Sequence, residues 1–258
     1  MIHPLYGQLP PNQQMAAIMP NREGKRKVVL ATNIAETSLT IEGIKIVIDS
    51  GFERVAKFNP NSGLSRLETV QISKDSADQR AGRAGRLSAG VCYRMWTTAT
   101  QSRLEEHGIP EIEQADLSSL VLDMAQWGIS DPQQLTWLSP PPKGHVAKAS
   151  DLLHELEALE DGKITSHGKQ LHNLPTHPRI AHMLVRAKEH NQLALATDIA
   201  AVLEERDPLP KESGIDINLR IEALRRYRRD KLGGKQFSRI EKIANQYRQL
   251  FKIEANNN

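Results

Sequence analysis

The segment 79–86 concentrates side chains that could bind a polyphosphate. It reads QRAGRAGR, so Arg80, Arg83 and Arg86 stand three residues apart with only Ala and Gly between them. On a helix the three would lie on roughly one face. Guanidiniums donate paired N–H bonds to phosphate oxygens, and small residues let a ligand approach closely. A solvated basic helix is the alternative, but the small-residue filling and the leading Gln79 favour the phosphate-binding interpretation.

The elements before this segment predict an α/β unit that would position it. Residues 27–32 and 44–49 are apolar runs of strand length, typical of buried parallel strands. Between them lies a hydroxyl-rich stretch, 33–41, directly after a strand end. In open α/β sheets, ligands bind beyond the carboxyl ends of strands. We therefore expect this stretch to face a ligand, although loop filling is the plainer interpretation.

Flanking segments extend this unit. Residues 1–10 read as a strand end passing into a loop, followed by a helix over 13–19. Two alternating runs around a Pro/Asn/Gly turn predict a β-hairpin at about 53–72, which is either a protruding feature or an ordinary meander at the sheet edge. Residues 91–96 read as the last strand and place Cys92 in an apolar run, as a buried structural thiol.

The pattern turns helical beyond a boundary near residues 97–110. Apolar positions at helical spacing predict helices over 117–127 and 145–159, then a short strand and turn at 161–165 and a helix over 167–173. Helices with a small β-wing suggest a winged helix, which either binds nucleic acid or packs as a scaffold. Further helices are expected from Pro178, capped by Thr176 or the residue before it, and over 193–204, 217–231 and 236–252.

Composition and charge limit the classes of function. With 39% hydrophobic and 25% charged residues, the 258-residue chain is typical of globular domains. We find no membrane-length apolar run and no signal peptide, and a single cysteine fits the cytoplasm. The spacing of the histidines predicts no metal site. Residues 209–258 hold 12 Lys/Arg against 6 Asp/Glu, a weak hint of nucleic-acid binding. Candidate phosphate contacts there are Arg225, Arg226, Arg228 and Arg229, with a solvated face as the alternative.

Three motifs together resemble superfamily 2 helicases of the DEAH/RHA group. QRAGRAGR resembles motif VI, ATNIAETSLTIEGI (31–44) resembles motif V, and LYG-x-LP (5–10) resembles the stretch after motif IV. LPTHPRIAHMLVRA (174–187) looks most like the bacterial HrpB-type branch. The resemblance implies an α/β RecA-like domain over 1–105, the second helicase lobe truncated at its N-terminus. An α-rich degenerate winged helix over 106–173 and an incomplete helical ratchet-like bundle over 174–258 would follow.

The resemblance also implies roles for individual residues at an ATP site between two lobes. Arg86 would be the arginine finger at the γ-phosphate, Arg83 would support the phosphates, and Gln79 would help place the attacking water. Arg80 would instead tie its helix to its own domain. The residues implied near the nucleotide are Ser38 on the γ-phosphate side, Thr40 and Glu42 near the ribose, and Ile18 on the adenine. Glu42 departs from the Asp that is common in relatives, and core packing accounts equally well for Ile18.

Motif V implies the nucleic-acid contacts. Thr32 and Asn33 match positions that hold the backbone of a single strand. RNA is the expected strand rather than DNA, although backbone contacts do not read the base. The hairpin at 53–72 matches the strand-separating wedge of the family.

Two motifs that ATP hydrolysis requires are missing from the 258 residues. There is no G-x-x-x-x-G-K-[ST] loop and no DEAH-like acidic motif for Mg²⁺. We therefore expect part of a longer helicase that uses ATP with Mg²⁺ held by a first RecA-like lobe, and no hydrolysis by this chain alone. The alternative is a non-catalytic nucleic-acid- or protein-binding module that uses the winged helix and the basic C-terminal helices.

Overall fold

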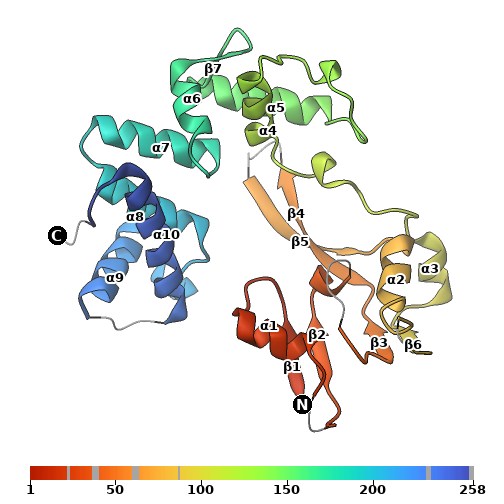
Figure 1. The fold of residues 1–258 in the computed structure, drawn as a ribbon. Coiled ribbons are helices and arrows are strands. Elements are labelled where there is room, and N and C mark those ends of the chain that lie inside the picture. The colour runs from red at the N-terminus through yellow and green to blue at the C-terminus, as the bar shows by residue number, and fades with distance from the viewer. Residues whose placement is uncertain (22–23, 37–40, 60–63, 87, 231–233, 256–258) are drawn as a thin grey trace. The chain divides into compact units, whose positions relative to one another are not determined.

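The computed structural model describes residues 1–21, 24–36, 41–59, 64–86, 88–230 and 234–255 (Figure 1). Its contacts divide the chain into two compact units. Unit 1 is Met1–Asp116 with Ser139–Pro142, and unit 2 is Leu117–Leu138 with Lys143–Asn258. The predicted divisions near residues 105 and 173 remain predictions.

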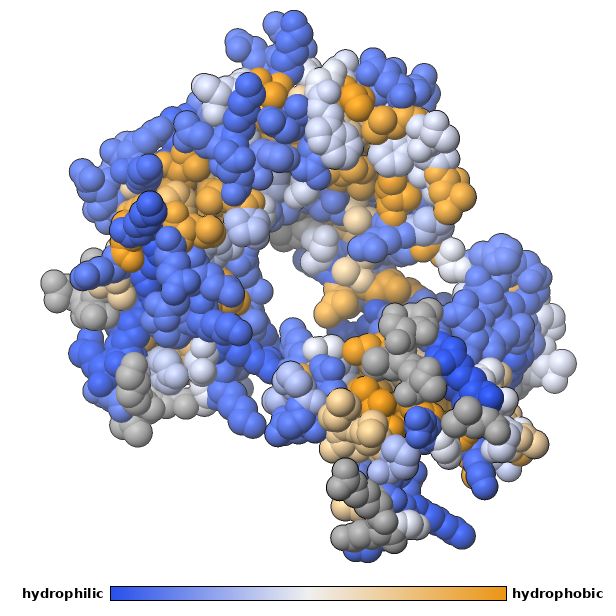
Figure 2. Space-filling model, in the orientation of Figure 1, coloured by the Kyte–Doolittle hydropathy of each residue, from blue (hydrophilic) through white to orange (hydrophobic). Residues whose placement is uncertain are grey.

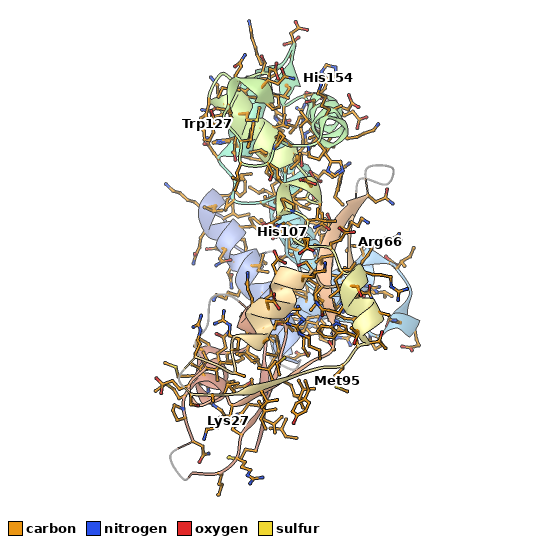
Figure 3. The ribbon with its side chains drawn as sticks, turned by 90° about the vertical axis from the view of Figure 1, so that its right-hand side faces the viewer. Lys27, Arg66, Met95, His107, Trp127 and His154 are labelled. Carbon is orange, nitrogen blue, oxygen red and sulfur yellow. The ribbon has the colours of Figure 1, made fainter. Side chains whose placement is uncertain are left out.

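Unit 1 is built on two parallel strand pairs. Strand β1 (Ile2–Leu5) pairs with β2 (Val28–Ala31), and β3 (Ile46–Asp49) pairs with β6 (Val91–Arg94). Parallel neighbours need a long crossover, and helix α1 (Pro11–Ile18) lies in the crossover between the first two strands. Lys27 (Figure 3) donates through Nζ to the carbonyls of Ala17 and Met19, both at 2.7 Å, at the end of α1. The strands and helix predicted from sequence are present.

One face of each strand pair is exposed, which corrects the prediction of buried strands. Ile2 and Val28 face each other across the first pair and are 70% and 53% exposed. Ile48 and Tyr93, partners in the second pair, are 70% and 56% exposed. Figure 2 shows apolar side chains at the surface over the strands of unit 1. Their apolar runs are typical of strands covered on both faces, and the described residues of this chain cover only one.

The predicted hairpin is confirmed. Strands β4 (Phe52–Asn59) and β5 (Leu64–Gln71) are antiparallel, in a register that pairs Phe52 with Gln71. The N–H of Phe58 donates to the carbonyl of Gln114 at 2.8 Å, just after the short helix η2 (Glu111–Glu113). The distal part of the hairpin is therefore held by a later segment of its own unit. The remaining helices of unit 1 are α2 (Lys74–Ala81) and α3 (Thr98–Arg103).

Unit 2 begins with a helical pair and a small hairpin. Its elements are α4 (Ser118–Gln126), η3 (Pro132–Gln134), α5 (Lys143–Glu155), β7 (Leu159–Glu160), β8 (Lys163–Ile164) and α6 (Ser166–His172). Asp161 and Gly162, with φ of 49° and 72°, form the tight turn between β7 and β8. Two consecutive positive φ values are typical of an Asp-Gly hairpin turn. The helix expected over 145–159 ends at Glu155, and Leu159 lies in β7 instead.

The second half of unit 2 is a helical bundle. It comprises α7 (Pro178–Glu189), α8 (Leu193–Glu204), η4 (Lys211–Ser213), α9 (Ile217–Asp230) and α10 (Lys235–Phe251). Two apolar clusters fill it, one around Leu224 and Ile240 and one around Leu184 and Tyr247. His177, rather than Thr176 or Pro175, caps α7, because its Nδ1 accepts from the N–H of Arg179 at 3.2 Å. None of the described helices is long and apolar enough to cross a membrane.

Candidate functional site

The arginine segment is not one continuous helix, which corrects the prediction that its three arginines share a helical face. Helix α2 ends at Ala81, and residues 82–85 form a turn. There the N–H groups of Arg83, Ala84 and Gly85 bond to carbonyls three residues earlier, at 3.1–3.3 Å. Gly82 and Gly85 are poor helix formers, which explains the early end. We call residues 82–86 the arginine turn.

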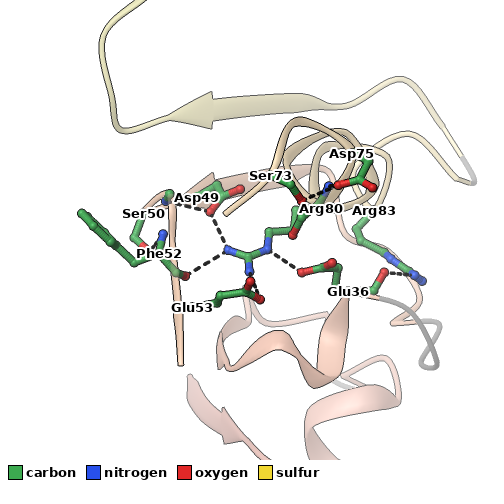
Figure 4. A network of polar contacts seen from close by, with 11 residues as sticks. Glu36, Asp49, Ser50, Phe52, Glu53, Ser73, Asp75, Arg80 and Arg83 are labelled. Carbon is green, nitrogen blue, oxygen red and sulfur yellow. Dashed lines mark hydrogen bonds and ion pairs between the residues drawn. The ribbon is translucent and has the colours of Figure 1, made fainter. Parts of the chain in front are cut away.

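Arg80 lies in an acidic cluster inside unit 1 (Figure 4). Its Nε donates to Glu36 Oε2 at 2.8 Å, and its Nη1 donates to Asp49 Oδ1 at 3.1 Å and to the Phe52 carbonyl at 3.2 Å. Glu53 Oε2 lies 3.7 Å from Nη2. Burial alone would lower the pKa of Arg80, but hydrogen bonds and charge from Glu36 and Asp49 raise it overall. Arg80 therefore ties α2 to its own unit, as expected.

The acidic cluster affects its own carboxylates as well. Burial raises the pKa of Glu53, and the nearby Glu36 charge raises it further, although Arg80 opposes both. Asp49 is 4% exposed, and one of its carboxylate oxygens accepts the Gly51 N–H at 3.0 Å. One guanidinium thus faces three carboxylates: it donates hydrogen bonds to Glu36 and Asp49, whereas Glu53 lies at ion-pair distance.

Arg83 bonds to the backbone of Glu36, whereas Arg80 bonds to the Glu36 carboxylate. Its Nη2 donates to the backbone carbonyl of Glu36 (Figure 4). Burial lowers the pKa of Arg83, and the neighbouring Arg86 charge lowers it further. The charge of Glu36 opposes this lowering. Two arginines in one short turn are a donor set that suits a phosphate.

Gln79 and Arg86 are exposed, on the last turn of α2 and at the end of the arginine turn respectively. The structure thus separates the four long polar side chains of the segment by environment. Arg80 is enclosed, Arg83 is half-buried, and Gln79 and Arg86 face outward. The last three are the residues that the resemblance assigns to catalysis.

The loop that follows β2 brings the predicted strand-binding residues near the arginines. Thr32 and Asn33 are exposed at the start of the 3₁₀ helix η1 (Asn33–Ala35). The N–H of Thr32 donates to the Leu5 carbonyl at 3.1 Å, which fixes the start of the loop to β1. Glu36 closes the turn and contacts both Arg80 and Arg83. The strand-binding and phosphate-binding candidates therefore share one support.

The other predicted nucleotide contacts are Ser38, Thr40, Glu42 and Ile18. Ser38 and Thr40 lie outside the described residues. Glu42 is exposed, and Ile18 is half-buried at the end of α1 next to the core residue Ala17, which fits core packing as well as a base contact. Cys92 is half-buried rather than fully buried, and burial raises the pKa of its thiol. Among the described residues no cluster of three or more His, Cys, Asp or Glu could hold a metal ion.

The sequence did not identify Glu36 and Asp49 as the hydrogen-bonded support of Arg80, or Glu53 as the carboxylate beside them. A signal existed for Glu36, because it is the only charged residue between Ala31 and Ile41. Nothing in the sequence distinguished Asp49 or Glu53 from ordinary strand-end and hairpin carboxylates. Their role follows from tertiary contacts across 31 and 27 residues.

The basic C-terminal segment is less cationic than its composition indicates. Arg228, one of the four candidate phosphate contacts, is buried and bonds to Asp198 and Glu241. Arg220 and Arg248 are also buried in ion pairs. The prediction for Arg228 is therefore wrong, because the bundle core needs its charge. Arg226 and Arg229 are exposed, and Arg225 is half-buried.

Comparisons with known proteins match part of the chain to a known domain. Residues 1–88 match the helicase conserved C-terminal domain. The chain is 49% identical over 205 residues, 80% of its length, to "ATP-dependent RNA helicase HrpB" of Escherichia coli. It is 40% identical over 215 residues, 81% of its length, to "Probable ATP-dependent RNA helicase DHR2" of Saccharomyces cerevisiae.

Solved structures extend the match to nearly the whole chain. Two crystal structures, of the E. coli DExH-box NTPase HrpB and of the Escherichia coli DEAH/RHA helicase HrpB, share 40% identity with it and cover 99% of it. Their TM-scores are 0.77 and 0.83. The chain spans only 25% and 29% of the two curated relatives and 30% and 31% of the chains in the two structures.

Proposed function

Since the chain belongs to the HrpB-like DEAH/RHA helicases and carries their conserved C-terminal helicase domain, we propose that it supplies the second lobe and accessory regions of an ATP-dependent RNA helicase. Arg83 and Arg86 act toward an ATP phosphate, and Thr32 and Asn33 act toward an RNA strand. The observation that carries the proposal is the shared support: Glu36 bonds the arginine turn and ends the 3₁₀ turn that starts at Asn33.

The arginines would stabilise charge that develops during phosphoryl transfer. ATP with Mg²⁺, when bound against a first RecA-like lobe, supplies the reactive γ-phosphoryl group. Arg86 then donates to its oxygens as the arginine finger, Arg83 holds the phosphates, and Gln79 positions the attacking water. The place of both arginines in one short turn supports this assignment. Ser38, Thr40, Glu42 and Ile18 are assigned to the same nucleotide by resemblance alone.

The proposed RNA contacts are made by short hydrogen-bonding side chains rather than by arginines. Thr32 and Asn33 present short hydrogen-bonding side chains at an exposed loop, which suits a sugar–phosphate backbone. The hairpin β4–β5 is the candidate wedge, and its link to Gln114 would hold it against a duplex. A degenerate winged helix over 106–173 and a ratchet-like bundle over 174–258 complete the proposed machinery, in the cytoplasm.

The 258 residues contain no phosphate loop and no DEAH-like motif, so we expect no ATP hydrolysis by this chain alone. The test is phosphate release by the purified chain with and without RNA. Turnover near that of a complete helicase would contradict the proposal.

The decisive experiment is Arg86→Ala in a complete helicase that carries this chain. We expect RNA-stimulated ATP hydrolysis to fall about 10³-fold or more, with RNA binding largely kept, because the finger contacts only the transferring phosphoryl group. Arg103→Ala is the matched control, since Arg103 is an exposed arginine of unit 1 outside the motif. If Arg86→Ala leaves turnover unchanged while charge reversal at Arg226 and Arg229 abolishes RNA binding, the non-catalytic binding module replaces this proposal.

A further inference from the structure

Glu36 makes three hydrogen bonds through three different groups. Its N–H donates to the Asn33 carbonyl at 2.9 Å. Its carboxylate accepts from Arg80 Nε at 2.8 Å, and its backbone carbonyl accepts from Arg83 Nη2. Glu36 is therefore bonded to Asn33, to Arg80 of helix α2 and to Arg83 of the arginine turn, and Figure 4 shows the last two of these bonds.

The bond to Arg80 fixes where the Glu36 carbonyl points. The two side chains are 15% and 14% exposed, and Arg80 is itself held by Asp49 on β3. A largely buried ion pair with several further hydrogen bonds keeps its geometry, because breaking it leaves an uncompensated charge. The carbonyl that receives Arg83 is thus held in place by the side chain of the same residue.

The connection from Glu36 back to the strand-binding residues is short and stiff. Ala35 N–H donates to the Thr32 carbonyl at 3.2 Å, and Glu36 N–H closes the next turn on Asn33. A shift of the backbone at residues 32–33 must therefore move the Glu36 carbonyl or break this single turn. Chains of hydrogen-bonded elements of this kind can carry energetic coupling between two sites.

We infer that Glu36 is a positioning residue that couples RNA held at Thr32 and Asn33 to the orientation of Arg83 at the phosphates. This inference rests on the proposed function and adds the residue through which its two ligands communicate. Glu36 contacts neither ligand. Its backbone N–H bonds to Asn33 and its backbone carbonyl accepts from Arg83, so its backbone connects the two binding segments. Its carboxylate fixes that backbone through the bond with Arg80.

The competing explanation is that Glu36 has a purely structural role, and a substitution of Glu53 distinguishes the two explanations. Glu53 also lies beside the Arg80 guanidinium and is partly buried, but it belongs to β4 and not to the loop. Loss of its charge should weaken the acidic cluster without touching the link to Arg83. Glu53→Gln is therefore the matched control for Glu36→Gln.

The experiment measures the RNA affinity of a complete helicase carrying this chain, with and without a non-hydrolysable ATP analogue. The ratio of the two Kd values is the coupling. We expect Glu36→Gln to reduce this ratio about fivefold or more, within the usual range of coupling energies, and Glu53→Gln to keep the wild-type ratio. Equal ratios for Glu36→Gln and the wild type, or equal losses in both variants, overturn the inference.

Two further measurements keep the outcome interpretable. Hydrogen exchange of the amides of Ala35 and Glu36 should be at least about threefold faster in Glu36→Gln than in Glu53→Gln. If Glu36→Gln fails to fold, Arg80→Lys, which keeps the charge but loses the fork, should reduce the same ratio, and an unchanged ratio there overturns the inference. Arg86→Ala is run in parallel: if it retains ATP hydrolysis, the proposed function fails, whereas an inactive Arg86→Ala with an unchanged Glu36→Gln ratio rejects only the inference.

Discussion

Arg80, Arg83 and Arg86 are identical side chains in three different environments. Arg80 is enclosed by carboxylates, Arg83 is bonded to a carbonyl, and Arg86 is exposed. A similar division occurs in unit 2, where Arg228 is buried and its neighbour Arg229 is exposed. Charge counted from sequence therefore overstates the cationic surface, because buried arginines are already paired.

The carboxylate of Asp198 is central to the bundle, and its removal should be costly. It is fully buried and bonds to Arg228 Nη1 at 2.8 Å and Arg248 Nη1 at 3.0 Å. Asp198→Ala leaves two buried guanidiniums short of their partner, so we expect a loss of about 3–5 kcal/mol in the free energy of unfolding. Urea unfolding measures it. Asp151→Ala is the control, because Asp151 and its partner Lys148 are both exposed and the loss should cost less than about 1 kcal/mol.

A histidine pair should make unit 2 less stable in mild acid. His167 Nε2 lies 2.9 Å from His182 Nδ1, which also contacts the Leu156 carbonyl at 3.1 Å. Burial lowers the pKa of His167 from 6.5, and His182 and Arg186 lower it further, whereas Glu157 and Glu189 oppose this. His167 therefore binds a proton more readily in the unfolded chain than in the folded protein. The stability that depends on a neutral His167 is fully present above about pH 6.5, the pKa in the unfolded chain. It is lost as the pH falls through the lower pKa that His167 has in the folded protein.

Thermal unfolding from pH 7.5 to pH 5 tests this. The melting temperature of unit 2 should decrease as the pH is lowered, and His167→Gln should make this decrease smaller. An equally steep slope in His167→Gln would contradict the role of the pair.

At the scale of elements, the arginine turn depends on a close approach between two backbones. An added Cβ at Gly90 would lie 2.1 Å from the carbonyl oxygen of Ala84, whereas nothing lies within 4 Å of such an atom at Gly85. The strand β6 follows directly after Gly90. The position of the arginine turn is therefore set by the chain that leads into β6.

Gly90→Ala should consequently displace the arginine turn. We expect unit 1 to lose about 1–3 kcal/mol, the usual cost of overpacking, and the amides of residues 83–85 to exchange faster. Gly85→Ala should change the stability of unit 1 by less than about 0.5 kcal/mol. Similar effects of the two substitutions would mean that the contact with Ala84 does not matter.

At the scale of the whole molecule, the two units differ in how much apolar surface they bury. The described residues of unit 2 form two apolar clusters, with Leu184, Leu224 and Ile240 fully buried. Unit 1 leaves Ile2, Ile48 and other strand residues exposed. Two-stranded parallel sheets open on one face have little stability of their own.

We therefore expect the chain to unfold in two transitions, with unit 1 melting first. Differential scanning calorimetry combined with hydrogen exchange assigns each transition to its unit. Asp198→Ala should shift only the upper transition, and Gly90→Ala only the lower. A single transition shifted by both substitutions would contradict independent unfolding.

The sequence by itself determined the kinds of elements and the chemistry of the motifs. Apolar runs located the strands, alternation around Asn-Pro-Asn located the hairpin, and QRAGRAGR with ATNIAETS indicated the helicase family. These are local properties, since period, turn chemistry and motif spacing depend on neighbouring residues. Tertiary structure alone decided which arginine is buried, which carboxylates surround it and that Glu36 joins two segments 47 residues apart. Those outcomes depend on contacts between distant parts of the chain, and residue types alone do not specify such contacts.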